Sequence, residues 1–301
     1  MLHTPILLLV FNRPEQALLV FRQIRLQQPE QLFIAADGPR ADRPEEAALC
    51  EATRTAVLNG IDWPCKVETL FRPHNLGCGK AVSTAIDWFF GHVEEGIILE
   101  DDCVPDPTFF SFCTAMLTKY RLSPNIMHIN AGNYQAGMQR GNASYYFSRY
   151  AHVWGWATWR RAWQYYDFTL LRYQHDSRQG LNNFMRSELE SIYNAKTDTW
   201  DTQWFMTVWF NKGWVITPNI SLVKNIGFNR NATHTRFVPR WFNKMQYGKI
   251  ADIKHPTENN IDEEADRYTI NTVFNPGGLS LGLKKIVKNN ALLYNLYKRI
   301  S

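Results

Sequence analysis

Apolar runs alternate with amphipathic stretches over the first hundred residues. Short apolar runs predict four strands, at residues 5–11, 31–36, 65–71 and 96–99. Between them, apolar residues recur at helical spacing and predict helices over 15–27, 41–58 and 79–90. Strands that alternate with helices in this way form a parallel sheet covered by helices. The pattern therefore predicts an α/β fold.

The pattern changes after Pro107. A helix is predicted over 109–121, followed by short strands, turns and eight tryptophans between residues 150 and 215. We therefore predict two halves of one domain, 1–107 and 108–245, and a C-terminal extension over 246–301. From Leu279 onward the extension mixes leucines and isoleucines with lysines, which is typical of a basic amphipathic helix. Such a helix either rests on an anionic membrane or packs on the sheet.

Composition narrows the class of protein. The chain has 301 residues, of which 45% are hydrophobic and 20% charged, so disorder and fibrous repeats are excluded. Its net charge of +5 is dispersed and does not indicate nucleic-acid binding. No apolar run approaches the roughly 20 residues of a membrane-spanning helix. The N-terminus lacks a signal pattern and the five cysteines form no C-x-x-C pair, which together favour a cytoplasmic protein with reduced thiols.

An acidic triplet, Glu100, Asp101 and Asp102, directly follows the fourth predicted strand. The carboxyl ends of parallel strands meet at one sheet edge, where ligands of such folds bind. Two carboxylates about 4 Å apart repel by about 1 kcal/mol in water and several times more near a protein surface, so the triplet favours a cation. Oxygen ligands select a hard ion, Mg²⁺ or Mn²⁺, that also holds phosphates. The alternative is a solvated acidic turn before Pro105.

A glycine pair, Gly77 and Gly79, precedes Lys80 and the third predicted helix. The segment is not a P-loop, because Ala81 replaces the required Ser or Thr, and it fails as a dinucleotide fingerprint because Val82 replaces the third glycine. The glycines permit a tight entry into the helix. The unpaired N–H groups at its start could attract a diphosphate.

Asp198 and Asp201 flank Trp200 before a helix predicted over 202–212. Either aspartate could cap that helix, since Asp is a favoured capping residue. Alternatively, Asp201 is partly buried between Trp200 and Trp204, has a raised pKa and acts as a general base. The tryptophans belong to a core by default, although aromatic faces also stack on sugars and bases.

Five motifs in this order resemble one enzyme family. They are Phe11-Asn12-Arg13-Pro14, Ala36-Asp37-Gly38-Pro39, Asn75-Leu76-Gly77, Ile98-Leu99-Glu100-Asp101-Asp102 and Trp154-Gly155-Trp156-Ala157-Thr158-Trp159. Over residues 5–240 the chain resembles bacterial glycosyltransferases of the GT-A fold, and it is most similar to relatives of the N-acetylglucosaminyltransferase that begins complex N-glycan branching. The resemblance implies a Rossmann-like mixed sheet flanked by helices, with the nucleotide sugar on residues 1–107 and the acceptor and catalytic half on 108–245.

The resemblance also implies roles for single residues. Asp102 would ligate the Mn²⁺ or Mg²⁺ that bridges the nucleotide diphosphate, while Asp101 and Glu100 would contact the ribose and the donor sugar. The nucleotide would be contacted by Phe11, Asn12 and Arg13, and its uracil N–H would be accepted by Asp37.

Three further roles accompany the same resemblance. The catalytic base would be Asp201, with Asp198 next in line because Thr202 and Gln203 stand where the family has a second acid. Thr233 and His234 would close over the diphosphate. Lys80 would serve the phosphates where the family has a histidine.

The expected activity is therefore an inverting, metal-dependent transfer of a sugar from a UDP-sugar to a hydroxyl of a glycan or lipid-linked glycan, as in bacterial surface polysaccharide synthesis. The enzyme would be cytoplasmic, with peripheral membrane contact through its C-terminal helix. One alternative is a sugar nucleotidyltransferase, which normally carries a Gly-rich basic loop after the first strand. Another is a catalytically inactive sugar-binding protein of the same fold.

Overall fold

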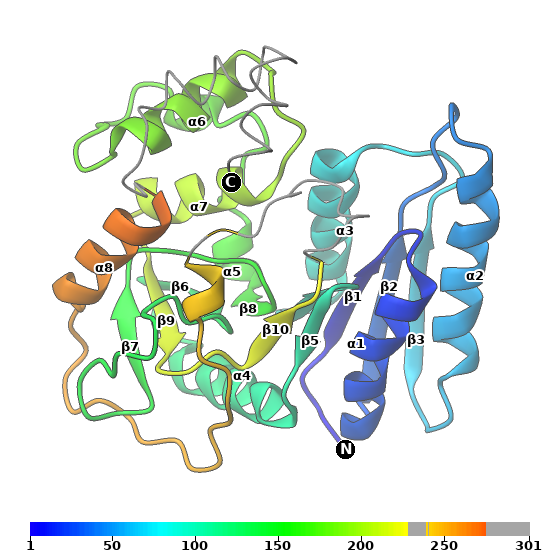
Figure 1. Cartoon of the computed structure of the whole chain (residues 1–301), viewed down its shortest axis with the longest axis horizontal. Coiled ribbons are helices and arrows are strands. Elements are labelled where there is room, and N and C mark those ends of the chain that lie inside the picture. Colours follow the sequence, from blue (N-terminus) through cyan, green and yellow to red (C-terminus); the bar gives the residue numbers. More distant parts are fainter. Residues whose placement is uncertain (228–238, 240, 275–301) are drawn as a thin grey trace.

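The computed structural model describes residues 1–227, 239 and 241–274. Its centre is a mixed eight-stranded sheet in the order β3-β2-β1-β4-β8-β6-β9-β7, with helices on both faces (Figure 1). The predicted α/β class with a mixed, helix-flanked sheet is confirmed. Thr233, His234 and the predicted helix from Leu279 onward lie outside the described residues.

The first half of the chain supplies four parallel strands of the sheet. A helix connects each of these strands to the next one in the sequence. The strands are β1 (Ile6–Val10), β2 (Gln31–Ala36), β3 (Lys66–Phe71) and β4 (Glu95–Glu100). The helices are α1 (Pro14–Gln27), α2 (Glu45–Asn59) and α3 (Cys78–His92). The predicted start of α2 at residue 41 is wrong, because the residue before Pro44 is disfavoured in a helix and the helix begins after that proline.

The second half extends the same sheet. The strands β8 (Trp156–Trp159), β6 (Ile126–Asn130), β9 (Trp214–Pro218) and β7 (Tyr145–Ser148) follow β4 across it. A small antiparallel pair joins β5 (Cys103–Pro105) to β10 (Val223–Asn225). The helices are α4 (Pro107–Tyr120), α5 (Arg160–Trp163), α6 (Asn183–Tyr193), α7 (Asp201–Phe210) and α8 (Glu263–Thr269). Shorter helical turns cover Leu171–Tyr173, Phe242–Lys244 and Ile270–Phe274.

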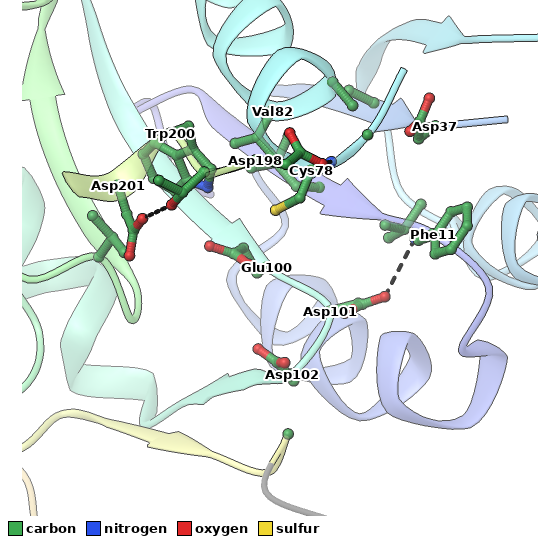
Figure 2. Close-up of a pocket in the computed structure, with 18 of the residues that line it drawn as sticks. Phe11, Asp37, Cys78, Val82, Glu100, Asp101, Asp102, Asp198, Trp200 and Asp201 are labelled. Carbon is green, nitrogen blue, oxygen red and sulfur yellow. Dashed lines mark hydrogen bonds between the residues drawn. The ribbon is translucent and has the colours of Figure 1, made fainter. Parts of the chain in front are cut away.

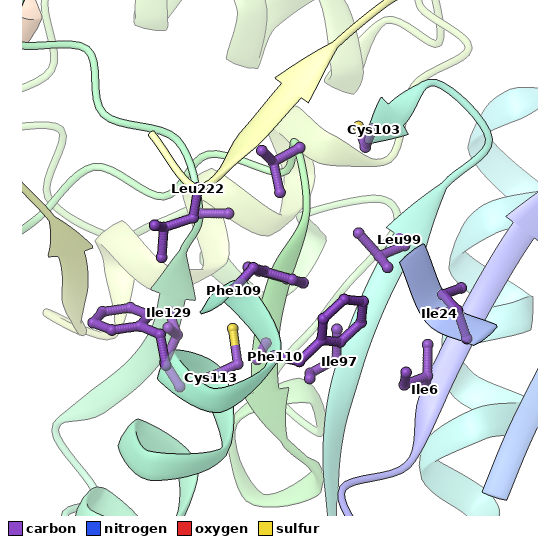
Figure 3. Close-up of a cluster of buried hydrophobic side chains, with 14 of the residues drawn as sticks. Ile6, Ile24, Ile97, Leu99, Cys103, Phe109, Phe110, Cys113, Ile129 and Leu222 are labelled. Carbon is purple, nitrogen blue, oxygen red and sulfur yellow. The ribbon is translucent and has the colours of Figure 1, made fainter. Parts of the chain in front are cut away.

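Alternation along the strands divides the core into two layers. Ile6 and Leu8 of β1 pack with α1 and α4 on one face, in the cluster drawn in Figure 3. Leu7 and Leu9 face the opposite way and pack with α3. Each large aliphatic side chain buried in this way stabilises the fold by about 1.5–3 kcal/mol. Because both faces of β1 are buried, its carboxyl end is held rigidly at the sheet edge.

Several tryptophans form a buried layer beneath α7. Trp156 and Trp204 are fully buried, with ring centroids 5.7 Å apart, and Trp200 stacks on Trp156 at 5.8 Å. His128 stacks on Trp156 at 5.0 Å and accepts a 2.9 Å hydrogen bond from Trp204 Nε1. The core role predicted for the aromatic cluster is confirmed for these residues. The layer fixes the start of α7, where Asp201 stands.

None of the helices formed by the described residues is long and apolar enough to cross a membrane.

Candidate functional site

A cavity of about 610 Å³ opens at the carboxyl ends of β1, β2 and β4 (Figure 2). This volume falls within the roughly 300–1,000 Å³ of small-molecule sites. The first half contributes the strand ends and the start of α3. The second half contributes residues 197–202 and the segment after β10. The cavity therefore lies between the two halves of the sheet.

Most of the predicted site residues line this cavity. The structure brings together Phe11, Arg13, Asp37, Glu100, Asp101, Asp102 and Asp201. It does not bring in Asn12 or Lys80, neither of which lines the cavity; Lys80 is exposed on α3. The acidic triplet is therefore not a fully solvated turn: Asp101 is buried, and all three residues line the cavity.

Arg13 forms ion pairs with two residues of the acidic triplet. Its Nη1 lies 3.1 Å from Asp102 Oδ2, and its Nη2 forms a close ion pair with Asp101. The backbone N–H of Phe11 donates to Asp101 Oδ2 at 3.3 Å. The strand-one motif and the strand-four motif, distant in sequence, are thus parts of one charged cluster because β1 and β4 are neighbours.

The cluster carries more negative than positive charge. Burial, followed by the charges of Asp102 and Asp101, raises the pKa of Glu100 well above its usual value, while Arg13 opposes the rise. Burial also raises the pKa of Asp101 to about 6, against the attraction of Arg13. Arg13 therefore does not fully offset the burial and mutual repulsion of the three carboxyl groups.

The carboxylates of the site suit a metal ion that is also coordinated by substrate phosphates and water. Within the described ranges, no three His, Cys, Asp or Glu side chains form a group that could hold a metal ion. Mg²⁺, however, is commonly bound through one or two carboxylates together with substrate phosphates and water. The carboxylate of Asp102, at the turn between β4 and β5, fits this manner of binding. Asp101 is more fully occupied by Arg13 and the Phe11 N–H.

Asp37 holds the loop that leads into α3. Its carboxylate accepts the N–H of Leu76, at 3.0 and 3.1 Å, and the N–H of Gly38 at 2.9 Å. Burial raises its pKa, and these backbone donors oppose the rise. The side chain of Asn75 fastens the same loop by donating to Gly38 O at 2.9 Å. The motifs around residues 37 and 75 therefore form one wall of the cavity.

Asp198 caps α3, and not the helix that follows it in sequence. Its carboxylate accepts the N–H groups of Cys78 at 3.0 Å and Gly79 at 2.8 Å. The prediction that these N–H groups are unpaired and open to a diphosphate is therefore wrong. The glycine pair is explained by the same contact, since a Cβ added to Gly77 or Gly79 would lie 2.6 or 2.7 Å from an Asp198 carboxylate oxygen.

Asp201 is the first residue of α7 and is exposed, so the partial burial predicted between Trp200 and Trp204 is wrong. The two indoles are buried in the tryptophan layer, while the exposed aspartate lines the cavity. Its Oδ1 accepts the N–H of Thr202 at 2.9 Å and pairs closely with the Thr199 hydroxyl. These two bonds orient the carboxylate toward the cavity.

Sequence reasoning missed other wall residues. Arg40 and Arg72 line the cavity on the side of Asp37, and the Cys78 thiol, whose pKa is raised by burial and by Glu100, faces the interior. Glu188 comes from α6, and no motif marks it.

Gly227 lies so close to the triplet that an added Cβ would sit 2.3 Å from Asp102 Oδ2. A glycine after a short strand was the only sequence signal for that approach.

No known family profile matches the chain, and no curated protein is similar to it in sequence. Among solved structures, it is similar to UDP-glucose pyrophosphorylase complexed with UDP-glucose, at 9% identity over 75% of this chain and 92% of that chain, with a TM-score of 0.36. Two others are HddC from Yersinia pseudotuberculosis (9% identity, 60% and 87% covered, TM-score 0.33) and 4-diphosphocytidyl-2C-methyl-D-erythritolsynthase from Anaerococcus prevotii DSM 20548 (8% identity, 73% and 92% covered, TM-score 0.35).

Proposed function

We propose that the protein is a glycosyltransferase of the GT-A type that transfers a sugar from a UDP-sugar to a hydroxyl of a glycan acceptor with inversion. One observation carries the proposal. Carboxylates from three separate segments, at Asp37, residues 100–102 and Asp201, face one cavity at the carboxyl edge of the sheet. The acceptor would be a glycan or lipid-linked glycan of bacterial surface polysaccharide synthesis.

The donor would lie across the ends of β2, β1 and β4. Asp37 would accept the uracil N–H, and Glu100 and Asp101 would accept hydroxyl protons of the donor sugar and ribose. Asp102 would hold Mn²⁺ or Mg²⁺ against the diphosphate, where such an ion neutralises the charge of the leaving group. Arg13, already paired to Asp101 and Asp102, would keep the triplet in position.

Asp201 would act as the general base. The acceptor oxygen forms a bond to the anomeric carbon, the bond from that carbon to the diphosphate oxygen breaks, and the electron pair leaves with UDP. The acceptor proton passes to the carboxylate of Asp201. Its exposure at the opening suits this role because an acceptor can reach it from solvent, and its bonds to Thr199 and Thr202 keep it oriented.

A sugar nucleotidyltransferase is the second candidate. Arg13, Arg40 and Arg72 all line the cavity, and three guanidinium groups suit a nucleoside triphosphate. The segment after β1, however, runs Phe11-Asn12-Arg13-Pro14 and contains no glycine to wrap a triphosphate. The lack of such a glycine is the observation that favours transfer from a UDP-sugar.

One assay separates the candidates. The protein is incubated with a panel of UDP-sugars and Mn²⁺, and UDP release is measured with and without glycan acceptors. The proposal expects UDP release that is abolished by EDTA. Pyrophosphate formed from a nucleoside triphosphate and a sugar phosphate would instead identify a nucleotidyltransferase. Binding of UDP without turnover of any donor would identify an inactive sugar-binding protein.

A further inference from the structure

A second cavity, of about 190 Å³, adjoins the first. The two share the wall residues Val153, Trp154, Glu188, Asp201 and Thr202. The smaller cavity therefore lies directly beside Asp201. Most of its remaining lining is aromatic.

The aromatic rings form two walls. Tyr134, Trp154 and Trp241 make the first, with centroids 5.1 to 5.8 Å apart. The second is built from Phe184, Phe205 and Phe274, in which Phe205 stacks on Phe274 at 5.4 Å.

His152 joins the two walls. Its ring stacks on Tyr134 at 3.9 Å and lies nearly parallel to Phe274 at 6.0 Å. Burial lowers the pKa of His152 to about 3, so the imidazole is neutral at physiological pH. The aromatic part of the cavity thus carries no formal charge.

Its carboxylates are gathered at the junction with the larger cavity, whereas the phenol hydroxyl of Tyr134 belongs to the aromatic wall. Asp201 and Glu188 supply carboxylates there, and Thr202 supplies a hydroxyl. An occupant must therefore be apolar on its faces and carry hydrogen-bond donors at the edge that points to Asp201. A pyranose ring has this form, because its C–H groups make apolar faces and its hydroxyls lie at the rim.

Size gives an independent limit. A volume of about 190 Å³ equals that of about six waters at roughly 30 Å³ each, which is space for one hexose. A lipid chain would need a longer groove, and it would gain nothing from two carboxylates at the mouth.

We propose that the smaller cavity binds one pyranose ring of the acceptor, with its C–H face against the aromatic walls and its reacting hydroxyl directed to Asp201. This inference rests on the proposed function, since it places the acceptor beside the base. Glu188 would accept a neighbouring hydroxyl and fix the orientation of the ring.

The test uses the full chain and simple probes: methyl α- and β-glycosides of glucose, galactose, mannose and N-acetylglucosamine. Binding is measured by saturation-transfer NMR titration. At least one glycoside should bind, with saturation strongest at its ring C–H protons. Trp241→Ala and Phe184→Ala, one from each wall, should each weaken its binding about tenfold, as expected for the loss of one ring contact.

Matched variants separate ring contact from folding. Trp241→Phe keeps an aromatic face and should retain most of the affinity. Tyr165→Ala removes an exposed aromatic that lines neither cavity and should change nothing. Thermal unfolding and the dissociation constant of UDP are measured on every variant. The UDP constant should stay within twofold of the unmodified protein.

The outcomes are distinct. If no glycoside binds, or if binding is equal in the unmodified protein and both alanine variants, the acceptor pocket is overturned while UDP release can still support the proposed function. If a medium-chain alkyl glucoside binds through its tail and the methyl glycosides do not, the cavity is a lipid site and the inference is wrong. Ring-dependent glycoside binding without turnover of any UDP-sugar would keep the sugar pocket and overturn the proposed function.

Discussion

The carboxylate of Asp198 accepts the backbone N–H of Gly79 at 2.8 Å, although the two residues are 119 positions apart. This bond joins the start of α3, in the first half of the sheet, to the segment that leads into α7. A Cβ at position 79 would lie 2.7 Å from Asp198 Oδ1 and 2.8 Å from Thr199 O. Only glycine allows this approach, and Asp201 stands three residues after Asp198 in the same segment.

Asp198→Ala should therefore reduce both stability and turnover. Loss of a helix cap costs about 0.5–2 kcal/mol of the free energy of unfolding, measurable by urea denaturation. Turnover should fall because Asp201 is no longer held in place. Asp198→Asn keeps an acceptor oxygen, so its losses of stability and of turnover should both be smaller. Gly79→Ala should lower turnover without changing the charge of the protein. A stability loss with full turnover would show that the position of residues 197–199 does not matter to the reaction.

Asp201→Asn should lower the turnover number about 10²- to 10⁴-fold, the usual contribution of a general base. The dissociation constant of UDP should be unchanged, because the substitution keeps the shape and the hydrogen bonds of the helix start. The turnover number is measured by steady-state kinetics, and the dissociation constant of UDP by isothermal titration calorimetry. If full activity remained in Asp201→Asn and was lost in Asp198→Asn, the base would be Asp198.

Asp102→Asn should abolish the metal-dependent part of UDP binding. The amide removes the charge that would attract the ion and leaves the size of the side chain unchanged. In the unmodified protein EDTA should weaken UDP binding, whereas in Asp102→Asn it should have no further effect. Asp176→Asn, at an exposed position outside the cavity, is the matched control. Equal sensitivity of both variants to EDTA would contradict a metal at Asp102.

His128 should make the fold sensitive to acid. Burial lowers the pKa of His128 from 6.5 to about 4. Between these pH values the unfolded chain therefore binds a proton at this residue, whereas the native state does not. Its contribution to stability is complete above pH 6.5 and is lost as the pH falls toward 4, by up to about 1.4 kcal/mol per pH unit.

Urea denaturation at a series of pH values from 7 to 5 measures this loss. His128→Gln should be less stable at pH 7, because it disturbs the bond from Trp204 Nε1, but its stability should fall less steeply with acid. His74→Gln, at an exposed position, should keep the original slope. Equal slopes in all three proteins would mean that His128 takes up its proton in the native state.

The first half of the fold could be predicted from the sequence because each of its elements is specified locally. The buried strand at residues 31–36 has the predicted ends, and the acidic triplet stands at the end of β4, with Glu100 as the last residue of the strand. Once neighbouring parallel strands are assumed, Arg13, Asp37 and Asp102 must approach the same edge. The predicted convergence of the strand ends is confirmed by their shared cavity.

The second half could not be predicted to this depth, since its contacts join segments distant in sequence. Nothing near Asp198 indicates that it caps α3, because the capping preference of aspartate concerns the helix next to it. The exposure of Asp201 depends on how Trp200 and Trp204 turn into the layer with His128. The smaller cavity combines rings from segments as far apart as Tyr134 and Phe274, which no periodicity relates.

The pairing of β4 with β8 has a consequence for dissecting the protein. Gly96 and Ile98 on the acid-bearing strand lie opposite Thr158 and Trp156, so truncation after residue 107 would strip β4 of its outer neighbour. The severed fragment would present a row of unpaired backbone groups on an apolar strand, a template for intermolecular association. The fragment 1–107 should therefore be insoluble when produced alone and regain solubility when the remaining chain is supplied in trans.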